Sequence, residues 1–162
     1  MAELTTLEEK LAEVTGLAKA AQEATTKVES LVDDEELAAK LQQMRGEAEE
    51  TEQRCTRLAD DRDGKKTAIL EKAQETKNEA AEMMSTYLGS DSDDLDGFEF
   101  LTMAEAGEVG HWEILKTLNE RARNANLKEL CEWAIPIQQR HFEDVRNGSL
   151  TLAAEEDPNE VS

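Results

Sequence analysis

Residues 4–32 read LTTLEEKLAEVTGLAKAAQEATTKVESLV, and apolar or small side chains recur in this stretch at alternating intervals of three and four. The positions that share this spacing are Leu4, Leu7, Leu11, Val14, Ala18, Ala21, Thr25, Val28 and Val32. Side chains three and four residues apart lie on one face of an α-helix. The stretch therefore predicts a long amphipathic helix with one buried face.

Four further segments carry the same spacing, at residues 37–58, 69–87, 98–123 and 127–141. Asp33 and Asp34 offer N-caps for the second helix, and the acidic segment 90–97 is typical of a loop. Five helices with short connections predict an all-α protein, built as an antiparallel four-helix bundle with an additional helix. We expect residues 1–147 to form this bundle domain and residues 148–162 to form an acidic, flexible tail.

The composition excludes several classes of function. The chain of 162 residues has 38 acidic and 18 basic side chains, which gives a formal net charge of -20. Such a charge repels phosphates and anionic lipid headgroups, so we expect neither a nucleic-acid partner nor a membrane partner. The N-terminus lacks the basic and apolar pattern of a signal peptide, which predicts a cytoplasmic protein. Cys55 and Cys131 have no disulfide-type spacing, and we expect both to be reduced.

Both histidines of the chain fall on the predicted inward faces of their helices. Glu108 lies one turn before His111, and Gln138 lies one turn before His141. His111 is 14 residues before Ala125 and His141 is 16 residues after it. At 1.5 Å per residue these separations are about 21 and 24 Å, so the two histidines should lie at one level of the bundle. This arrangement predicts a metal site formed by Glu108, His111 and His141.

A complete two-metal centre would need more carboxylates than the predicted inward faces supply. The glutamates of the first two helices fall beside those faces, at Glu9, Glu13, Glu47, Glu50 and Glu52. Glu105, Glu113 and Asp144 are interpreted as charged surface residues. The alternative to a metal site is a structural layer, in which Glu108 and the two histidines form hydrogen bonds that fix the register of the helices.

Short motifs in the chain resemble the YciF-type ferritin-like stress proteins of bacteria. The resemblance covers roughly residues 5–147 and is carried by Glu49-Glu50-Thr51-Glu52 leading to Arg57-Leu58, by Gly64-Lys65-Lys66 and by His111-Trp112-Glu113-Ile114. It implies a ferritin-like bundle, often dimeric, with a two-metal carboxylate site and a stress-linked role. Glu50 and His111 match ligand positions of that family. The chain departs from the family at Gly110 and at Gln53-Arg54, where the resemblance implies two further ligands.

The resemblance implies a ferritin-like, stress-related protein, expected as a homodimer. Together with the spacing of the histidines it predicts a partial or degenerate metal site at Glu50, Glu108, His111 and His141. Iron, manganese or zinc would be the metal, and the absence of any metal stays open. One alternative is a di-iron carboxylate oxidoreductase or ferroxidase, which requires Glu9 and Glu50 to reach the centre. The other alternative is a structural bundle that assembles through an exposed helix face, with an unidentified protein partner.

Overall fold

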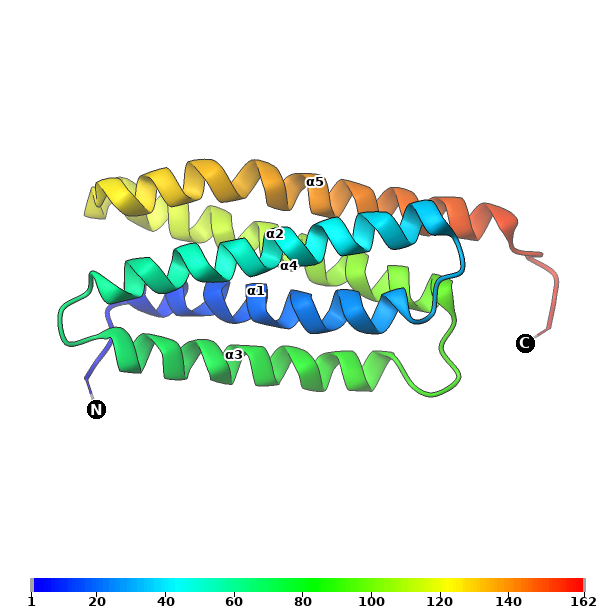
Figure 1. Ribbon diagram of the computed structural model, residues 1–162, viewed down its shortest axis with the longest axis horizontal. Coiled ribbons are helices and arrows are strands. Elements are labelled where there is room, and N and C mark those ends of the chain that lie inside the picture. The colour runs from blue at the N-terminus through cyan, green and yellow to red at the C-terminus, as the bar shows by residue number, and fades with distance from the viewer. Residues whose placement is uncertain (1, 162) are drawn as a thin grey trace.

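The computed structural model describes residues 2–161, which fold into five α-helices without any strand (Figure 1). The helices are α1 (Thr6–Glu29), α2 (Glu35–Asp60), α3 (Lys66–Tyr87), α4 (Asp94–Ala122) and α5 (Ala125–Glu155). The prediction of an all-α protein is confirmed. None of the helices within residues 2–161 combines the length and the apolar character needed to cross a bilayer.

Four helices begin at a side chain that caps their free backbone N–H groups. Thr5 caps α1, Asp34 caps α2, Asp93 caps α4 and Asn124 caps α5. Asp34 was among the predicted caps. Asp93 ends the acidic segment earlier than predicted, because its carboxylate accepts a hydrogen bond from the backbone N–H of Asp96 and so starts α4 at Asp94.

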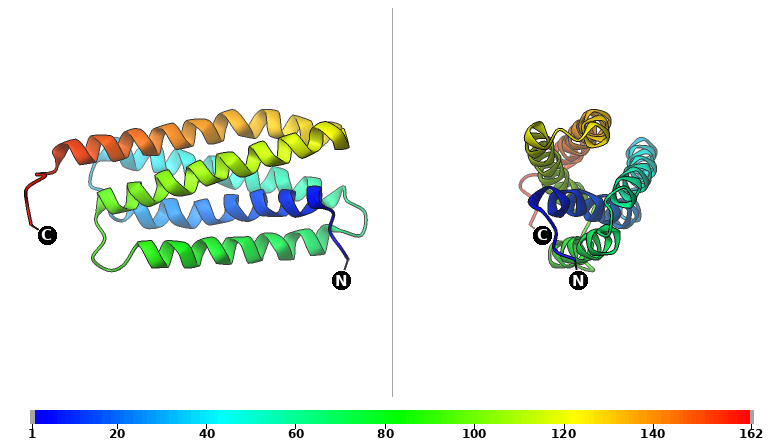
Figure 2. Two further views of the ribbon diagram at one scale, coloured as in Figure 1. Left: turned by 180° about the vertical axis from the view of Figure 1, so that it is seen from behind. Right: turned by 90° about the vertical axis from the view of Figure 1, so that its left-hand side faces the viewer.

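Helices α1, α2, α5 and α4 pack side by side in that order around a common core, and α3 lies outside them against α1. The view along the helices shows α3 on one side of α1 and α4 on the other (Figure 2). Gly16 permits the close approach of α1 and α3, because a Cβ atom at this position would overlap the backbone carbonyl oxygen of Ala73. Helix α3 makes few contacts with α4.

The C-terminal part of the chain differs from the sequence prediction. Helix α5 continues to Glu155, and both Gly148 and Leu152 are buried. Gly148 lies against the ring of Phe98, where a Cβ atom would collide. The inward spacing of α5 thus persists past the histidine, and the predicted boundary between residues 147 and 148 falls inside a packed helix.

Candidate functional site

The apolar core is interrupted halfway along the bundle by a layer of buried polar side chains. One apolar cluster includes Phe98 and Leu101 of α4, and a second cluster includes Trp112 and Leu115 of the same helix. The residues of α4 that lie between the two clusters and face inward are polar. Helices α1, α2 and α5 also contribute residues of one half to the first cluster and residues of the other half to the second cluster. We call the buried polar residues at this level the central layer: Thr51, Glu105, Glu108, Gln138 and His141.

The spacing of α4 explains why two glutamates point into the core. Its buried residues are Phe98, Leu101, Glu105, Glu108, Trp112, Leu115 and Asn119, together with Gly97 and Phe100. From Phe98 onward the first seven follow alternating steps of three and four, so they form one continuous inward stripe. Glu105 and Glu108 occupy the two middle positions of that stripe, on successive turns.

The two glutamate carboxyl groups are buried, and neither forms an ion pair with any residue in the range 2–161. Glu105 is 2% exposed and Glu108 is 4% exposed. The Oε2 atom of each has no hydrogen-bond partner among residues 2–161. Burial raises the pKa of Glu108 to about 8. Burial, and then the neighbouring charge of Glu108, raises the pKa of Glu105 well above its usual range. The pair therefore favours a shared proton or a bound cation over two free negative charges.

Two other buried side chains, Gln138 and Trp112, also contain polar atoms that lack partners among residues 2–161. Neither the Oε1 nor the Nε2 atom of Gln138 has a hydrogen-bond partner in the described part of the chain, and the same holds for Nε1 of Trp112. Leaving such groups buried and unpaired costs about 1–3 kcal/mol each. Burial raises the pKa of the Cys55 thiol to about 12, with a smaller contribution from Glu108, so this cysteine stays protonated and offers no thiolate. The unpaired atoms are thus carboxyl, amide and indole atoms, and of these the carboxyl and amide oxygens can act as metal ligands.

His141 joins the central layer to helix α2. It is 2% exposed, and its Nε2 atom lies 3.0 Å from Oε1 of Glu47. Glu47 also forms an ion pair with Arg140. Burial opposes ionisation of Glu47, but the hydrogen bonds from Arg140 and His141 outweigh it and lower the pKa of Glu47. Burial lowers the pKa of His141. The contact places a carboxylate of α2 beside the layer.

Two of the four predicted metal ligands lie outside the central layer. The side chain of His111 is 42% exposed; its Nδ1 atom is 2.8 Å from the carbonyl oxygen of Gly107, and its Nε2 atom is 3.9 Å from Oε2 of Glu13. His111 therefore does not face inward as predicted, because the adjacent Trp112 occupies the inward position. Glu50 is also exposed and forms an ion pair of 3.0 Å with Arg54.

The structure brings Glu108 and His141 to the central layer and adds residues that the sequence prediction left out. Glu105 was interpreted as surface, Gln138 entered only as a neighbour of His141, and Glu47 was placed beside the inward face. The position of Trp112 in the sequence could have predicted that Glu105 faces inward. An inward stripe drawn through this largest apolar side chain of α4 includes Glu105 and Glu108 and excludes His111.

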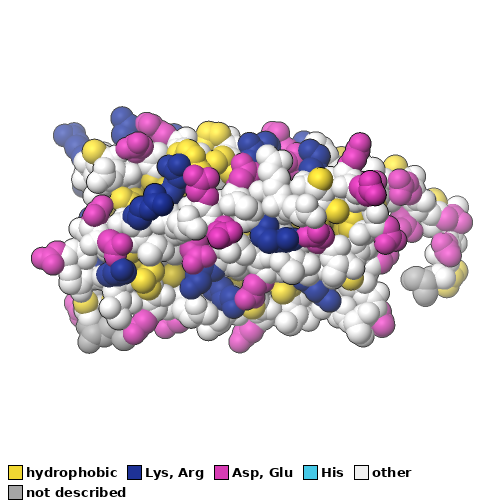
Figure 3. All heavy atoms as spheres, viewed as in Figure 1, with side chains coloured by type: hydrophobic (Ala, Val, Ile, Leu, Met, Phe, Trp, Pro, Cys, Tyr) yellow, Lys and Arg dark blue, Asp and Glu magenta, His cyan; other side chains and the backbone are white. Residues whose placement is uncertain are grey.

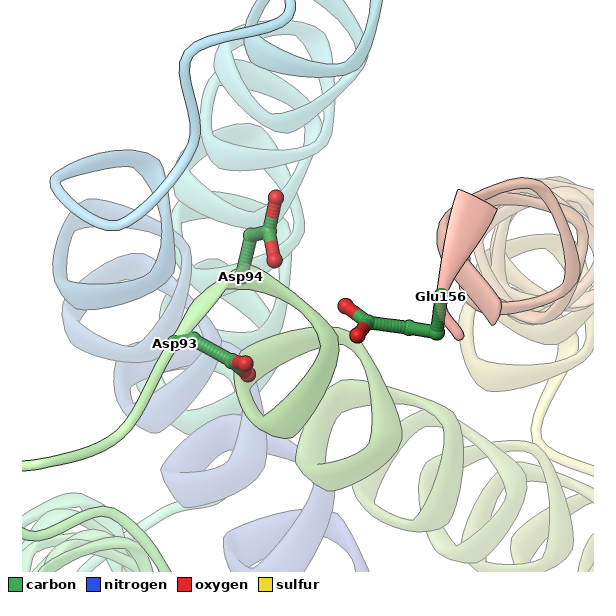
Figure 4. A group of neighbouring side chains, drawn as sticks. All are labelled: Asp93, Asp94 and Glu156. Carbon is green, nitrogen blue, oxygen red and sulfur yellow. The ribbon is translucent and has the colours of Figure 1, made fainter. Parts of the chain in front are cut away.

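A different acidic group lies at the end of the bundle. Asp93, Asp94 and Glu156 are the only three metal-type donors within residues 2–161 whose ligand atoms all lie within 4.8 Å of one another. Figure 4 shows Glu156 extending from the end of α5 toward the two aspartates at the start of α4. Asp93 and Glu156 are exposed, and the carboxylate of Asp93 already caps α4. This group is explained as a helix cap with acidic neighbours.

Comparison of the chain with protein-family models, with curated proteins and with solved structures finds no match.

Proposed function

We propose that the protein is a ferritin-like helical-bundle protein that binds a metal ion in its central layer, through a partial ligand set. Glu105 and Glu108 of α4 would be the main ligands, with Gln138 and His141 of α5 beside them. Carboxylate, imidazole and amide donors together suit iron, manganese or zinc. The stress-related role and the homodimer predicted from the sequence belong to the same proposal.

The observation that carries this proposal is the pair of unpartnered carboxyl oxygens on Glu105 and Glu108. A bound cation would balance the charge of both groups and would supply the partner that each oxygen lacks. Binding requires side-chain rotations that bring the donors together, since the donors of the central layer do not already converge within 4.8 Å in groups of three among the described residues.

The residues of the proposed site would have different roles in binding the metal. Glu105 and Glu108 provide negative charge, while the contact between His141 and Glu47 fixes the imidazole ring. The two apolar clusters lie on either side of the layer along the bundle. A metal bound here would supply Lewis acidity or redox chemistry. A two-metal oxidoreductase has less support, because Glu9 and Glu50, which it would need, are both exposed.

The test is metal binding by the full chain after chelator treatment. We expect equilibrium dialysis against iron(II), manganese(II) or zinc, followed by elemental analysis, to give close to one ion per chain. The variant Glu105→Gln/Glu108→Gln should lose this ion, and His141→Ala should weaken its binding. The matched control is Glu99→Gln/Glu113→Gln, which changes two exposed glutamates of the same helix.

The substitution His111→Ala separates this proposal from the ligand set predicted from the sequence. We expect it to leave metal binding unchanged, because the side chain lies outside the central layer. Wild-type protein that binds no metal, or a double variant that binds as much as wild type, would contradict the proposal. In that case the central layer would be a structural feature that fixes helix register.

A further inference from the structure

Seen from behind in Figure 2, α3 and α4 lie on either side of α1 and diverge along the bundle. Side chains of all three helices line a groove between α3 and α4. A cavity of about 180 Å³ lies in this groove, and its lining includes Leu17, Met83, Met103 and Gly107. A smaller cavity of about 50 Å³ shares part of this lining and reaches the buried glutamates of α4. The two helices touch near one end, where the ring centroids of Tyr87 and Phe100 are 6.1 Å apart. We call this feature the α3–α4 groove.

The apolar side chains along this groove are exposed although they continue amphipathic faces. Met83 is 52% exposed, Tyr87 is 58% exposed and Met103 is 41% exposed. In α3 the first two apolar residues of the predicted face, Ile69 and Ala73, are buried against the bundle. The second half of that face is covered only in part: Ala80 is half-buried and Tyr87 contacts Phe100, while Met83 stays exposed. An apolar face that remains uncovered marks a place where another molecule can bind.

Helix α4 presents a stripe that suits the close approach of another helix. Met103, Gly107, Gly110 and Ile114 follow steps of four, three and four, so they lie on one face. Ile114 is 47% exposed, and a Cβ atom on either glycine would meet no atom within 4 Å. The stripe spans 12 residues, and its 11 steps of 1.5 Å give a length of about 16 Å or three helical turns. Large apolar residues at its ends and glycines at its centre leave room for a helix of similar length.

The charge around the groove selects the kind of partner. Residues 78–115 form the second half of α3, the connecting loop and most of α4, and they contain no lysine or arginine. Apart from the buried Glu105 and Glu108, the same residues include eight acidic side chains that are exposed or half-buried: Glu79, Glu82, Asp91, Asp93, Asp94, Asp96, Glu99 and Glu113. On the opposite face, seen in Figure 3, Lys and Arg side chains are interspersed with Asp and Glu. Basic residues are therefore absent from these parts of α3 and α4 but present on the opposite face.

We propose that the α3–α4 groove binds a basic amphipathic helix of a partner protein. The apolar side of that helix would pack on Met83 and Met103, whose flexible thioether side chains adapt to differently shaped partners. Its lysine and arginine side chains would face the acidic flanks. A second copy of this chain fits less well, because each copy carries a net charge of -20. The proposal does not depend on metal in the central layer.

The test uses a labelled peptide of 18 residues, with leucines at helical spacing and lysines elsewhere, titrated with the full chain at physiological salt. Fluorescence anisotropy reports binding. We expect Met83→Asp/Met103→Asp to raise the dissociation constant at least tenfold, which is about 1.4 kcal/mol. The control Leu150→Asp, at a side chain of α5 that is 62% exposed, should bind like wild type. Gly107→Trp should also weaken binding, because the new ring fills the groove.

Three results would overturn the proposal. The first is equal binding of the peptide by wild type and by both groove variants. The second is equal binding of a peptide of the same composition whose leucines and lysines do not segregate on a helix, which would show attraction by charge alone. The third is a wild-type dimer in sedimentation velocity that Met83→Asp/Met103→Asp dissociates, which would make a second copy the occupant.

Discussion

Replacing Glu108 by glutamine should stabilise the metal-free protein, and the gain should grow as the pH rises. Burial raises the pKa of Glu108 from its ordinary value of 4.5 to about 8. Between these two values the folded chain keeps a proton that the unfolded chain has released. Stability falls with rising pH wherever the folded state binds more protons. Glutamine has a similar shape and no titration, so the variant lacks this loss.

The size of the effect follows from the pKa difference. One pKa unit corresponds to about 1.4 kcal/mol, and the loss accumulates at nearly this rate per pH unit inside the window. Between pH 5.5 and 7.5 the free energy of unfolding of wild type should therefore fall by roughly 2.5 kcal/mol relative to Glu108→Gln. Burial raises the pKa of Glu105 in both proteins, whereas the further rise caused by the charge of Glu108 is present in wild type only and adds to the difference.

His141 contributes a pH dependence of the opposite sign, which the comparison of the two proteins removes. Burial lowers the pKa of this histidine. The unfolded chain then takes up a proton more readily than the folded chain, so this contribution falls as the pH drops below the ordinary pKa of 6.5. Both proteins contain His141, and the difference between their stabilities reports Glu108.

The assay is urea unfolding of both proteins at pH 5.5, 6.5 and 7.5, with a chelator present throughout. The matched control is Glu113→Gln, an exposed glutamate of the same helix, whose stability should track wild type at each pH. A stability difference between Glu108→Gln and wild type that stays constant within 1 kcal/mol from pH 5.5 to 7.5 would refute the reasoning. Glu108 would then be ionised at little cost, and its environment would be polar.

Three further tests of the packing measure the free energy of unfolding in urea, two of them with a matched control substitution. Gly16→Ala should destabilise the protein by about 1–3 kcal/mol because the new methyl group overlaps α3, whereas Gly46→Ala, with open space around it, should stabilise by about 0.5–1 kcal/mol. Glu47→Ala should cost about 1–3 kcal/mol because it leaves buried His141 without its partner, while Glu50→Ala at the surface should stay within about 0.5 kcal/mol of wild type. Truncation after residue 147 should cost more than about 2 kcal/mol through loss of packed helix; an equal stability of the truncated and full chains would contradict the structure.

The helices could be predicted from the sequence because their signals are local. All nine positions predicted for the first inward face are buried or half-buried, and seven of them lie within α1, with Leu4 just before it and Val32 just after it. Capping residues such as Asp34 act on backbone groups two and three residues away, so their effect is readable without tertiary structure. Local spacing also predicted continuous helices on both sides of the α4–α5 turn.

The inward register of α4 could not be fixed by spacing alone. Two possible inward stripes of α4 share Leu101, Glu108 and Leu115. They differ by one residue at each position between these three. The predicted stripe contains His111, and the observed stripe contains Trp112. A change of one residue turns a side chain by about 100° around the helix. Burial of the indole ring, which removes more apolar surface from water than an imidazole, decides between the two stripes.

Contacts between distant helices were beyond the reach of the sequence pattern. Glu47 and His141 are 94 residues apart, and nothing local to either residue indicates their hydrogen bond. The prediction that both histidines share one level used helix length alone, which fixes height but not rotation about the helix axis. The exposed position of His111 shows that rotation decided the composition of the candidate site.

The unpaired polar atoms of the central layer lower the stability of the folded protein. Measuring this loss together with metal binding distinguishes a metal site from a layer that only fixes helix register. Apolar residues at Glu105, Glu108 and Gln138 would join the two clusters into one core and would remove unpaired buried atoms. Substituting apolar residues for buried charged groups is often neutral or stabilising. If Glu105→Gln/Glu108→Gln is more stable than metal-free wild type and no longer binds metal, the layer lowers stability in exchange for binding. If the double variant is more stable but wild type binds no metal either, the two glutamates serve to fix helix register. The function must then lie on the surface of the protein, and the α3–α4 groove is the first place to test.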